Sequence, residues 1–226
     1  MRSTSSDIHL NQSLQVKVIN PPFAPGGAEV NRINATLEFG GEGTLSIWET
    51  QSTASISTVE RLAPLEGQLA GLNYSITARA EPNGGGVPFS QAMQRNVVAF
   101  DALLTMPTYI PPARGITPGP GERLVGRRIE WGLDTAIPAD FFYAYITDPS
   151  QQTTYWEVYL PGDQLGFDLP DWPADAPRGP FPSGNALLII VSVDAFTFDY
   201  DSFEFNDFNY GNWKSYSLNG WGILNP

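Results

Sequence analysis

The sequence contains no cysteine and a single histidine, His9. The absence of cysteine excludes disulfide bonds, thiolate metal sites and a cysteine nucleophile. His9 lies near the N-terminus, where we expect the chain to be frayed. Catalytic triads that need a histidine base and metal sites built from histidines are therefore excluded as well.

Long hydrophobic runs are also lacking. The longest, Ala186 to Val191, suits a buried strand and falls far short of the ~20 apolar residues that span a membrane. The N-terminus carries no apolar signal region. Two explanations remain open: the protein is made without a signal peptide, or Met1 stands in place of one that was removed. We interpret the Ser/Thr/Gln-rich start as typical of a mature secreted or lipid-anchored chain, which predicts an extracellular or cell-envelope location.

Lysine is scarce, and positive charge is scarce overall. Only Lys17 and Lys214 accompany ten arginines, against 24 acidic residues, and the net charge is −12. Residues 1–110 carry six basic and nine acidic side chains (−3), and residues 111–226 carry six and fifteen (−9). A nucleic-acid partner is therefore not expected, because each phosphate contact would oppose this field. We interpret the bias toward arginine, alanine and proline as that of a GC-rich bacterium.

Helical segments are few, because 20 prolines and 22 glycines interrupt the chain and leave room for a short helix only at 57–62 or 89–94. Alternation of apolar and polar residues dominates instead, and it predicts antiparallel strands of an all-β sandwich protein. The apolar positions of the clearest strands are Leu14, Val16 and Val18; Leu45 and Ile47; and Tyr74, Ile76, Ala78 and Ala80.

A proline-rich stretch divides the chain. Pro107 to Gly121 contains five prolines and three glycines, a density typical of an extended, semi-rigid connector. It follows the apolar run Val97–Leu104, which we expect to be a strand. We therefore predict two sandwiches in tandem, an immunoglobulin-like domain at 1–106 and a second domain at 107–226. The alternative is a long loop inside one sandwich.

The second half resembles a fibronectin type III domain. Its expected strands include Arg128–Trp131, Asp140–Thr147 and Thr154–Leu160, followed by 166–170, 185–193 and a last strand within 213–224. The resemblance places the Trp131 strand second and Asp168-Leu169-Pro170 before the sixth strand. The chain departs from the family because Leu187 or Leu188 takes the place of the usual strand-F tyrosine, and because 196–210 is an insertion.

The first half contains a recognisable local motif at residues 69–78. The sequence Leu69-Ala-Gly-Leu-Asn-Tyr74-Ser-Ile-Thr-Ala78 resembles the tyrosine corner of immunoglobulin-like sandwiches. That resemblance implies a buried Tyr74 ring whose hydroxyl group bonds back to the main chain.

Acidic and aromatic side chains alternate from Asp194 to Asp207. Calcium takes six to eight oxygen ligands, so we consider Asp199, Asp201 and Glu204 a candidate calcium site, although their spacing is not that of an EF-hand. The alternative is a hairpin whose acids face water. The dense aromatics, Phe196, Phe198, Phe203 and Phe205, should be mostly buried, and a bulge or turn near Asp201-Ser202 is needed to keep them on one face.

Two tryptophans are candidates for a carbohydrate platform. Trp48 and Trp156 alternate out of phase with their apolar neighbours, so their rings could lie open to a sugar. Carboxylate pairs such as Asp168 with Asp171, or Asp199 with Asp201, could in principle cleave a glycoside, but such pairs arise by chance among 24 acids. We assign no catalytic residue and no cofactor apart from calcium.

We therefore expect a non-enzymatic sandwich module of the bacterial envelope or extracellular space, with a structural or interaction role and a protein or glycan surface as partner. One alternative is a carbohydrate-binding module, stabilised by calcium. Another is a subunit of a filament or phage particle that self-associates through edge strands or its N-terminal arm. These expectations rest on fold class, which by itself does not establish function.

Overall fold

The structure is a computed structural model that describes residues 10–19, 29–82, 84–133, 137–171, 175, 184–202, 204 and 212–224. In this part of the chain every regular element is a strand or a three-residue 3-10 helix, so the predicted all-β class is confirmed. The elements are β1 (Gln12–Lys17), β2 (Glu29–Glu38), η1 (Gly40–Glu42), β3 (Thr44–Ser52), β4 (Ile56–Leu62), η2 (Gly67–Leu69), β5 (Asn73–Pro82), β6 (Phe89–Val97), β7 (Leu104–Thr105), β8 (Arg114–Thr117), β9 (Arg128–Gly132), β10 (Phe141–Thr147), β11 (Thr154–Pro161), β12 (Gly166–Asp168), β13 (Asn185–Ala195), η3 (Tyr200–Ser202) and β14 (Trp213–Leu224).

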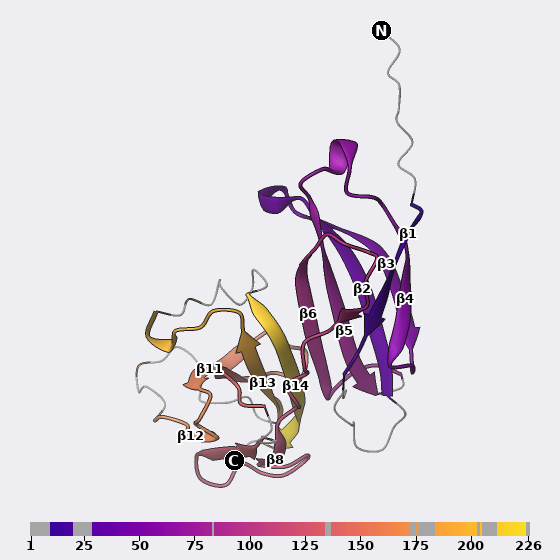
Figure 1. Ribbon diagram of the computed structural model, residues 1–226. Helices are drawn as coiled ribbons and strands as arrows, with labels where there is room; N and C mark the ends of the chain where they lie inside the picture. Colours follow the sequence, from indigo (N-terminus) through magenta and orange to yellow (C-terminus); the bar gives the residue numbers. More distant parts are fainter. Residues whose placement is uncertain are drawn as a thin grey trace.

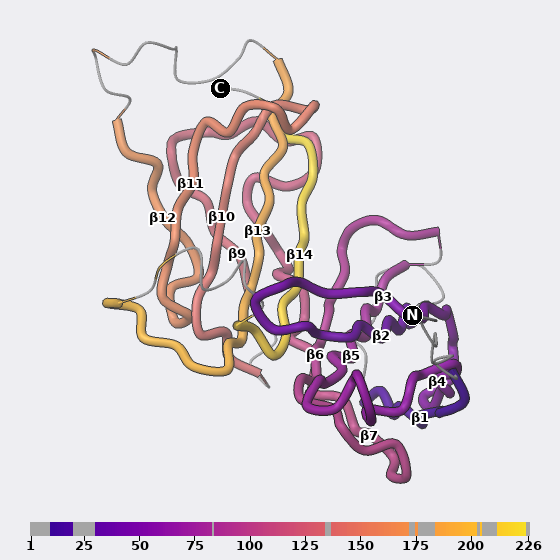
Figure 2. Tube along the Cα trace, turned by 90° about the horizontal axis from the view of Figure 1, so that it is seen from above, coloured from indigo at the N-terminus to yellow at the C-terminus, as the bar shows by residue number. Residues whose placement is uncertain are grey.

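An eight-stranded antiparallel sheet runs through both halves of the chain, in the order β11-β10-β13-β14-β6-β5-β2-β3. Its halves meet where β14 pairs with β6 over four residue pairs. Two three-stranded sheets, β4-β1-β7 and β12-β9-β8, complete the described sheets. Figure 1 shows the two groups of strands side by side. In Figure 2 the strands of the first half are seen nearly end-on while those of the second run across the picture, so the long sheet twists strongly where they meet.

Two separate cores lie between the sheets. One cluster of buried side chains runs from Leu14 to Tyr109 and the other from Ile110 to Ile223. The alternating residues that the sequence singles out in β1 and β5 all belong to the first cluster. Each half of the chain therefore supplies strands to two layers around its own core.

The second half has the strand order of a fibronectin III-like sandwich. Its first, second and fifth strands form one sheet, and its third, fourth, sixth and seventh form its part of the long sheet. The Trp131 strand is second, as the resemblance implies. The Trp131 ring and Leu188 of the sixth strand are both buried in the core. The first half differs, because the short β7, which follows its last long strand, pairs in parallel with β1.

Several local predictions are wrong. The two segments that left room for helix, 57–62 and 89–94, lie in β4 and β6. The apolar run Val97–Leu104 is not one strand, since β6 ends at Val97 and β7 begins at Leu104. In β3, a register shift places Trp48 opposite the buried Ala35, while Leu45 is 52% exposed. The extra residue of this bulge turns Trp48 to the core side, whereas Leu45 lies opposite the buried Leu37 and is exposed at the edge of the sheet.

The tyrosine corner is confirmed. The Tyr74 ring is fully buried in β5. The Ala63 N–H donates to the Tyr74 Oη atom over 2.9 Å, and the Tyr74 hydroxyl donates to the Ala63 carbonyl oxygen over 3.3 Å. Burial raises the pKa of Tyr74, and the bond from Ala63 opposes this only in part.

The proline-rich stretch is extended, but it is not an exposed connector. Residues 109–113 are buried, and residues 114–117 form β8. The division into domains at 1–106 and 107–226 stays a prediction, because the long sheet crosses this boundary.

Candidate functional site

The carboxylates proposed for calcium lie around the 3-10 turn η3. This turn confirms the predicted break near Asp201-Ser202. Asp199 uses one carboxylate oxygen to accept the Asp201 N–H over 3.1 Å, and both of these acids are exposed, as is Glu204. Within the described part of the chain, which includes all three acids, no group of three or more acidic or histidine side chains could hold a metal ion. The calcium hypothesis stays a prediction.

Of the aromatic residues predicted to be buried in this segment, the structure describes Phe196 and Phe198. Phe196 is 39% exposed, so the expectation of burial is wrong for this residue. Phe198 is partly buried because its ring stacks on Phe141, with 4.9 Å between centroids. The predictions for Phe203 and Phe205 fall outside the described residues.

The two candidate sugar-binding tryptophans lie in the edge strands at opposite ends of the long sheet, Trp48 in β3 and Trp156 in β11. Each is partly buried and packs against the core of its own half. The structure therefore does not bring them together into one platform. Carbohydrate binding by either one stays a prediction.

A row of tyrosines covers the outer face of the long sheet in the second half. The Tyr143 ring lies between Tyr145 and Tyr159, with centroid distances of 4.9 and 4.8 Å. The Tyr159 hydroxyl donates to a carboxylate oxygen of Glu157 over 3.0 Å. Burial, and then the nearby Glu157 charge, raise the pKa of both Tyr143 and Tyr159. Because the Tyr143 faces are covered by its neighbours, this ring is not available to stack on a sugar.

The carboxylate pair Asp168 and Asp171 is engaged by arginines. Asp168 accepts from Arg128, and Asp171 pairs with Arg127, which lowers the pKa of Asp171. Glycoside cleavage needs one carboxyl group that holds its proton. The Arg127 guanidinium favours the ionised form of Asp171 instead.

The place where β6 meets β14, which we call the joint, has hydrogen bonds on its inner side. There the connector crosses beneath the sheet, and three serines of β6 and β14 hold its main chain. The Ile110 N–H donates to Ser215 Oγ over 2.8 Å, and Ser90 Oγ donates to the Ile110 carbonyl over 2.7 Å. Ser217 Oγ donates to the Pro111 carbonyl over 3.0 Å. All three serines are fully buried, so water does not compete for these hydrogen bonds. The bonds therefore hold the connector in place against the sheet.

The outer side of the joint is closed by a charged and aromatic stack. The Arg79 guanidinium lies 3.7 Å from the centre of the Phe89 ring, and Phe89 meets Tyr216 edge-to-face. Arg79 and Arg32 also flank the carboxylate of Glu81, which is 4% exposed. A carboxylate held in this way is a structural group, because two cations stabilise its charge.

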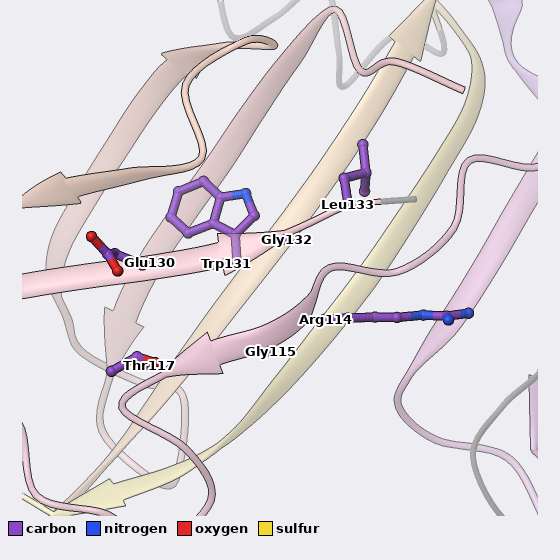
Figure 3. A pocket seen from close by; sticks show the side chains of 7 residues that line it. All are labelled: Arg114, Gly115, Thr117, Glu130, Trp131, Gly132 and Leu133. Atoms are coloured by element: carbon purple, nitrogen blue, oxygen red, sulfur yellow. The ribbon is translucent and has the colours of Figure 1, made fainter. Parts of the chain in front are cut away.

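A pocket of about 510 Å³ opens between β8 and β9 (Figure 3). Arg114 pairs with Gly132 and Thr117 with Glu130, so Gly115 and Ile116 together face Trp131 in a bulge. Gly115 has a φ of 56°, a left-handed conformation that glycine adopts without strain. Residues of both strands on either side of this bulge line the pocket.

Trp131 is the unusual residue of this pocket. Its ring is 5% exposed and packs edge-to-face on Phe142 and Phe167. Its indole N–H has no hydrogen-bond partner in the described part of the chain. An unpaired buried donor costs about 1–3 kcal/mol. The resemblance placed the Trp131 strand second, but no sequence signal indicated the burial of this ring, the bulge or the pocket beside it.

Neither the scan against protein-family models nor the search of curated proteins finds a match. The search of solved structures finds the chicken CNTN1 FN1-FN3 domains, 11% identical, with a TM-score of 0.26. The match covers 83% of this chain and 57% of that chain, so the chain spans little more than half its length. A TM-score this low identifies no family. The strand order and the two-layer packing described above give this chain an all-β, fibronectin III-like sandwich fold.

Proposed function

We propose that the protein is a non-catalytic module of the bacterial envelope or the extracellular space, with a structural or interaction role. The joint is the observation that carries this proposal. A spacer or scaffold must hold its parts in a fixed orientation. The pairing of β14 with β6, the bonds from Ser90, Ser215 and Ser217, and the stack of Arg79 on Phe89 together support such rigidity.

Small-angle X-ray scattering of the full chain tests the rigid-module proposal. We expect one fixed arrangement of the halves in the wild type, and a broader distribution when Ser215 and Ser217 are both replaced by alanine. Ser192→Ala is the matched control, because Ser192 is equally buried and its hydroxyl group has no hydrogen-bond partner in the described part of the chain. Free rotation of the halves in the wild type would contradict the proposal. Fractionation of the native cells tests the location, and a cytosolic protein would contradict it.

Carbohydrate binding is the second candidate. Trp156 supports it, because this ring is partly exposed and lies in an edge strand of the long sheet, where a sugar can approach it. A glycan array probed with the wild type and with Trp156→Ala tests it. Glycan binding that disappears in the Trp156→Ala variant would favour this function. A wild type that binds no glycan would contradict it.

Assembly through edge strands is the third candidate. The long sheet ends in β3 on one side and β11 on the other, and neither has a second partner among the described strands. An unpaired edge is a template for another chain. Sedimentation over a range of protein concentrations tests this function, which a monomer at all concentrations would contradict.

No described helix has the length and apolar character needed to cross a membrane.

A further inference from the structure

We infer that the outer face of the long sheet in the second half binds an arginine-bearing segment of a partner protein, with Tyr145 against the guanidinium group and Glu157 pairing with its charge. This binding rests on the interaction role proposed above and gives the chemistry of the partner. Its failure would leave the rigid-module proposal unaffected, because scattering tests that proposal separately.

The outer face of this half is apolar where a solvated face is normally polar. An antiparallel sheet with one face in water alternates apolar and polar residues. β13 instead places Ile189, Val191 and Val193 on its outer face, and all three are buried. The strand register adds large side chains beside them, with Tyr145 opposite Ile189 and Leu218 opposite Val191. A contiguous apolar patch of this kind marks an interaction surface.

One end of this face is covered by the chain itself. There the Phe198 ring stacks on Phe141, with 4.9 Å between centroids. Toward the other end, Tyr145 and Leu218 are partly exposed. Among the described residues, the Tyr145 ring contacts one other ring, that of Tyr143. Because Tyr145 stacks through one face and is partly exposed, we expect a ligand to contact its other face.

A carboxylate lies beside this ring. Glu157 is exposed and sits directly opposite Tyr145 in the neighbouring strand. It accepts a hydrogen bond from the Tyr159 hydroxyl over 3.0 Å, and no described lysine or arginine pairs with it. Two basic residues near this face, Lys214 and Arg79, are each bound to another acid. The Glu157 charge therefore remains for a cation from outside.

Two more carboxylates border the tyrosines at the covered end. The Tyr200 hydroxyl donates to the Tyr159 carbonyl oxygen over 2.8 Å and so holds η3 against β11. Asp199 and Asp201, before and within this turn, are exposed, and neither pairs with a described lysine or arginine. The local field, like the formal charge of −9 on this half, attracts a cation. A second copy of the chain would bring the same negative charge, which disfavours it as the occupant.

Arginine matches this face better than lysine does. A guanidinium group is planar, stacks on aromatic rings and binds a carboxylate with two parallel hydrogen bonds. An ammonium group is a compact, strongly hydrated charge without this planar fork. Side chains directly opposite on neighbouring strands have Cβ atoms about 4.5–5.5 Å apart, so one guanidinium can contact both Tyr145 and Glu157. Apolar residues beside the arginine would then lie on Ile189 and Leu218.

Fluorescence anisotropy of labelled peptides with the full chain tests the proposed binding. The probe is a short peptide in which arginine and leucine alternate, and its comparisons carry lysine or glutamate in place of arginine. We expect the arginine peptide to bind more tightly than the lysine peptide, and the glutamate peptide not to bind. Glu157→Gln should weaken binding of the arginine peptide by roughly 3- to 10-fold, the size of an exposed charge-assisted hydrogen bond. Tyr145→Leu should weaken it by roughly 2- to 5-fold, whereas Tyr145→Phe keeps the ring and should keep the affinity.

Glu130→Gln is the matched control, because it makes the same change at an exposed glutamate of the opposite sheet; its affinity should equal that of the wild type. The urea midpoint of each variant shows whether it is folded. The proposed binding is overturned if the arginine peptide does not bind, if the lysine or glutamate peptide binds as tightly, or if Glu157→Gln and Glu130→Gln have equal effects. A wild-type dimer that Tyr145→Leu dissociates in sedimentation would assign the face to a second copy and overturn it as well.

Discussion

Replacing Tyr74 by phenylalanine isolates the hydrogen bonds of the tyrosine corner. The phenylalanine ring keeps the buried volume and the edge-to-face contact with Phe100, whose centroid lies 5.7 Å away. Only the hydroxyl group is lost. Its removal leaves the Ala63 N–H and carbonyl without this partner, and Ala63 is buried, so water cannot replace it.

The expected cost is about 2 kcal/mol in the free energy of unfolding. The bond of 2.9 Å accounts for about 1 kcal/mol, and the buried N–H left unpaired adds a penalty of similar size. The longer contact of 3.3 Å adds little. Urea denaturation measures the change as a lower midpoint with an unchanged slope.

Tyr145→Phe is the control, because the Tyr145 ring is partly buried in β10 and burial alone accounts for the raised pKa of its hydroxyl group. We expect its free energy of unfolding to stay within about 0.5 kcal/mol of the wild type. A cost below about 0.5 kcal/mol for Tyr74→Phe, or an equal cost for both variants, would refute the reasoning.

Four further predictions concern the joint, the tyrosines, the domain boundary and calcium. Ser215→Ala should destabilise the protein by about 1–3 kcal/mol in urea denaturation because it leaves a buried N–H unpaired, while Ser192→Ala should be nearly neutral; equal effects would contradict the bonded joint. Burial raises the pKa of Tyr145 and Tyr216, so these hydroxyl groups keep their protons in the folded state at a pH where the unfolded chain loses them, near about pH 10. The free energy of unfolding should therefore be constant below that pH and fall above it. A urea midpoint unchanged between about pH 8 and about pH 11 would show that these rings are solvated. If the two halves are domains, trypsin should cut near Arg114 or Arg123 and leave two folded pieces, whereas a single cooperative unfolding without stable fragments would favour one unit. If the acids around η3 hold calcium, millimolar calcium should raise the melting temperature and Asp201→Asn should abolish the rise; identical melting curves in EDTA and in calcium would leave only the solvated acids.

The strands were predictable where period-two alternation is unbroken. The last strand was expected within 213–224 and occupies the whole of that range, and the expected strand at 154–160 corresponds to β11. Such segments bury one face each, so their pattern follows directly from the sheet geometry. Tyr74 was predictable for a different reason, because the corner is a local motif with its own sequence.

The failures share a physical cause. In β3, Trp48 faces the core because one extra residue enters the strand, and a bulge of this kind leaves no periodic signal in the sequence. The pocket beside Trp131 depends on a second bulge, between β8 and β9. The joint could not be foreseen either, since it pairs residues 89–92 with residues 215–218, more than a hundred positions apart. One sequence shows local patterns, whereas the bulges and the joint depend on how strands pair with one another.

The shared sheet also bears on the solubility of the chain. A free-standing half would end in an exposed strand, β6 in the first and β14 in the second, and exposed strand edges recruit other chains into aggregates. In the intact protein each half covers the edge of the other over four residue pairs. Truncation that removes either half would therefore expose an unpaired strand edge on the remaining half. We expect a fragment that ends before residue 107 to precipitate or dimerise at concentrations where the whole chain stays dispersed, even if the fragment folds.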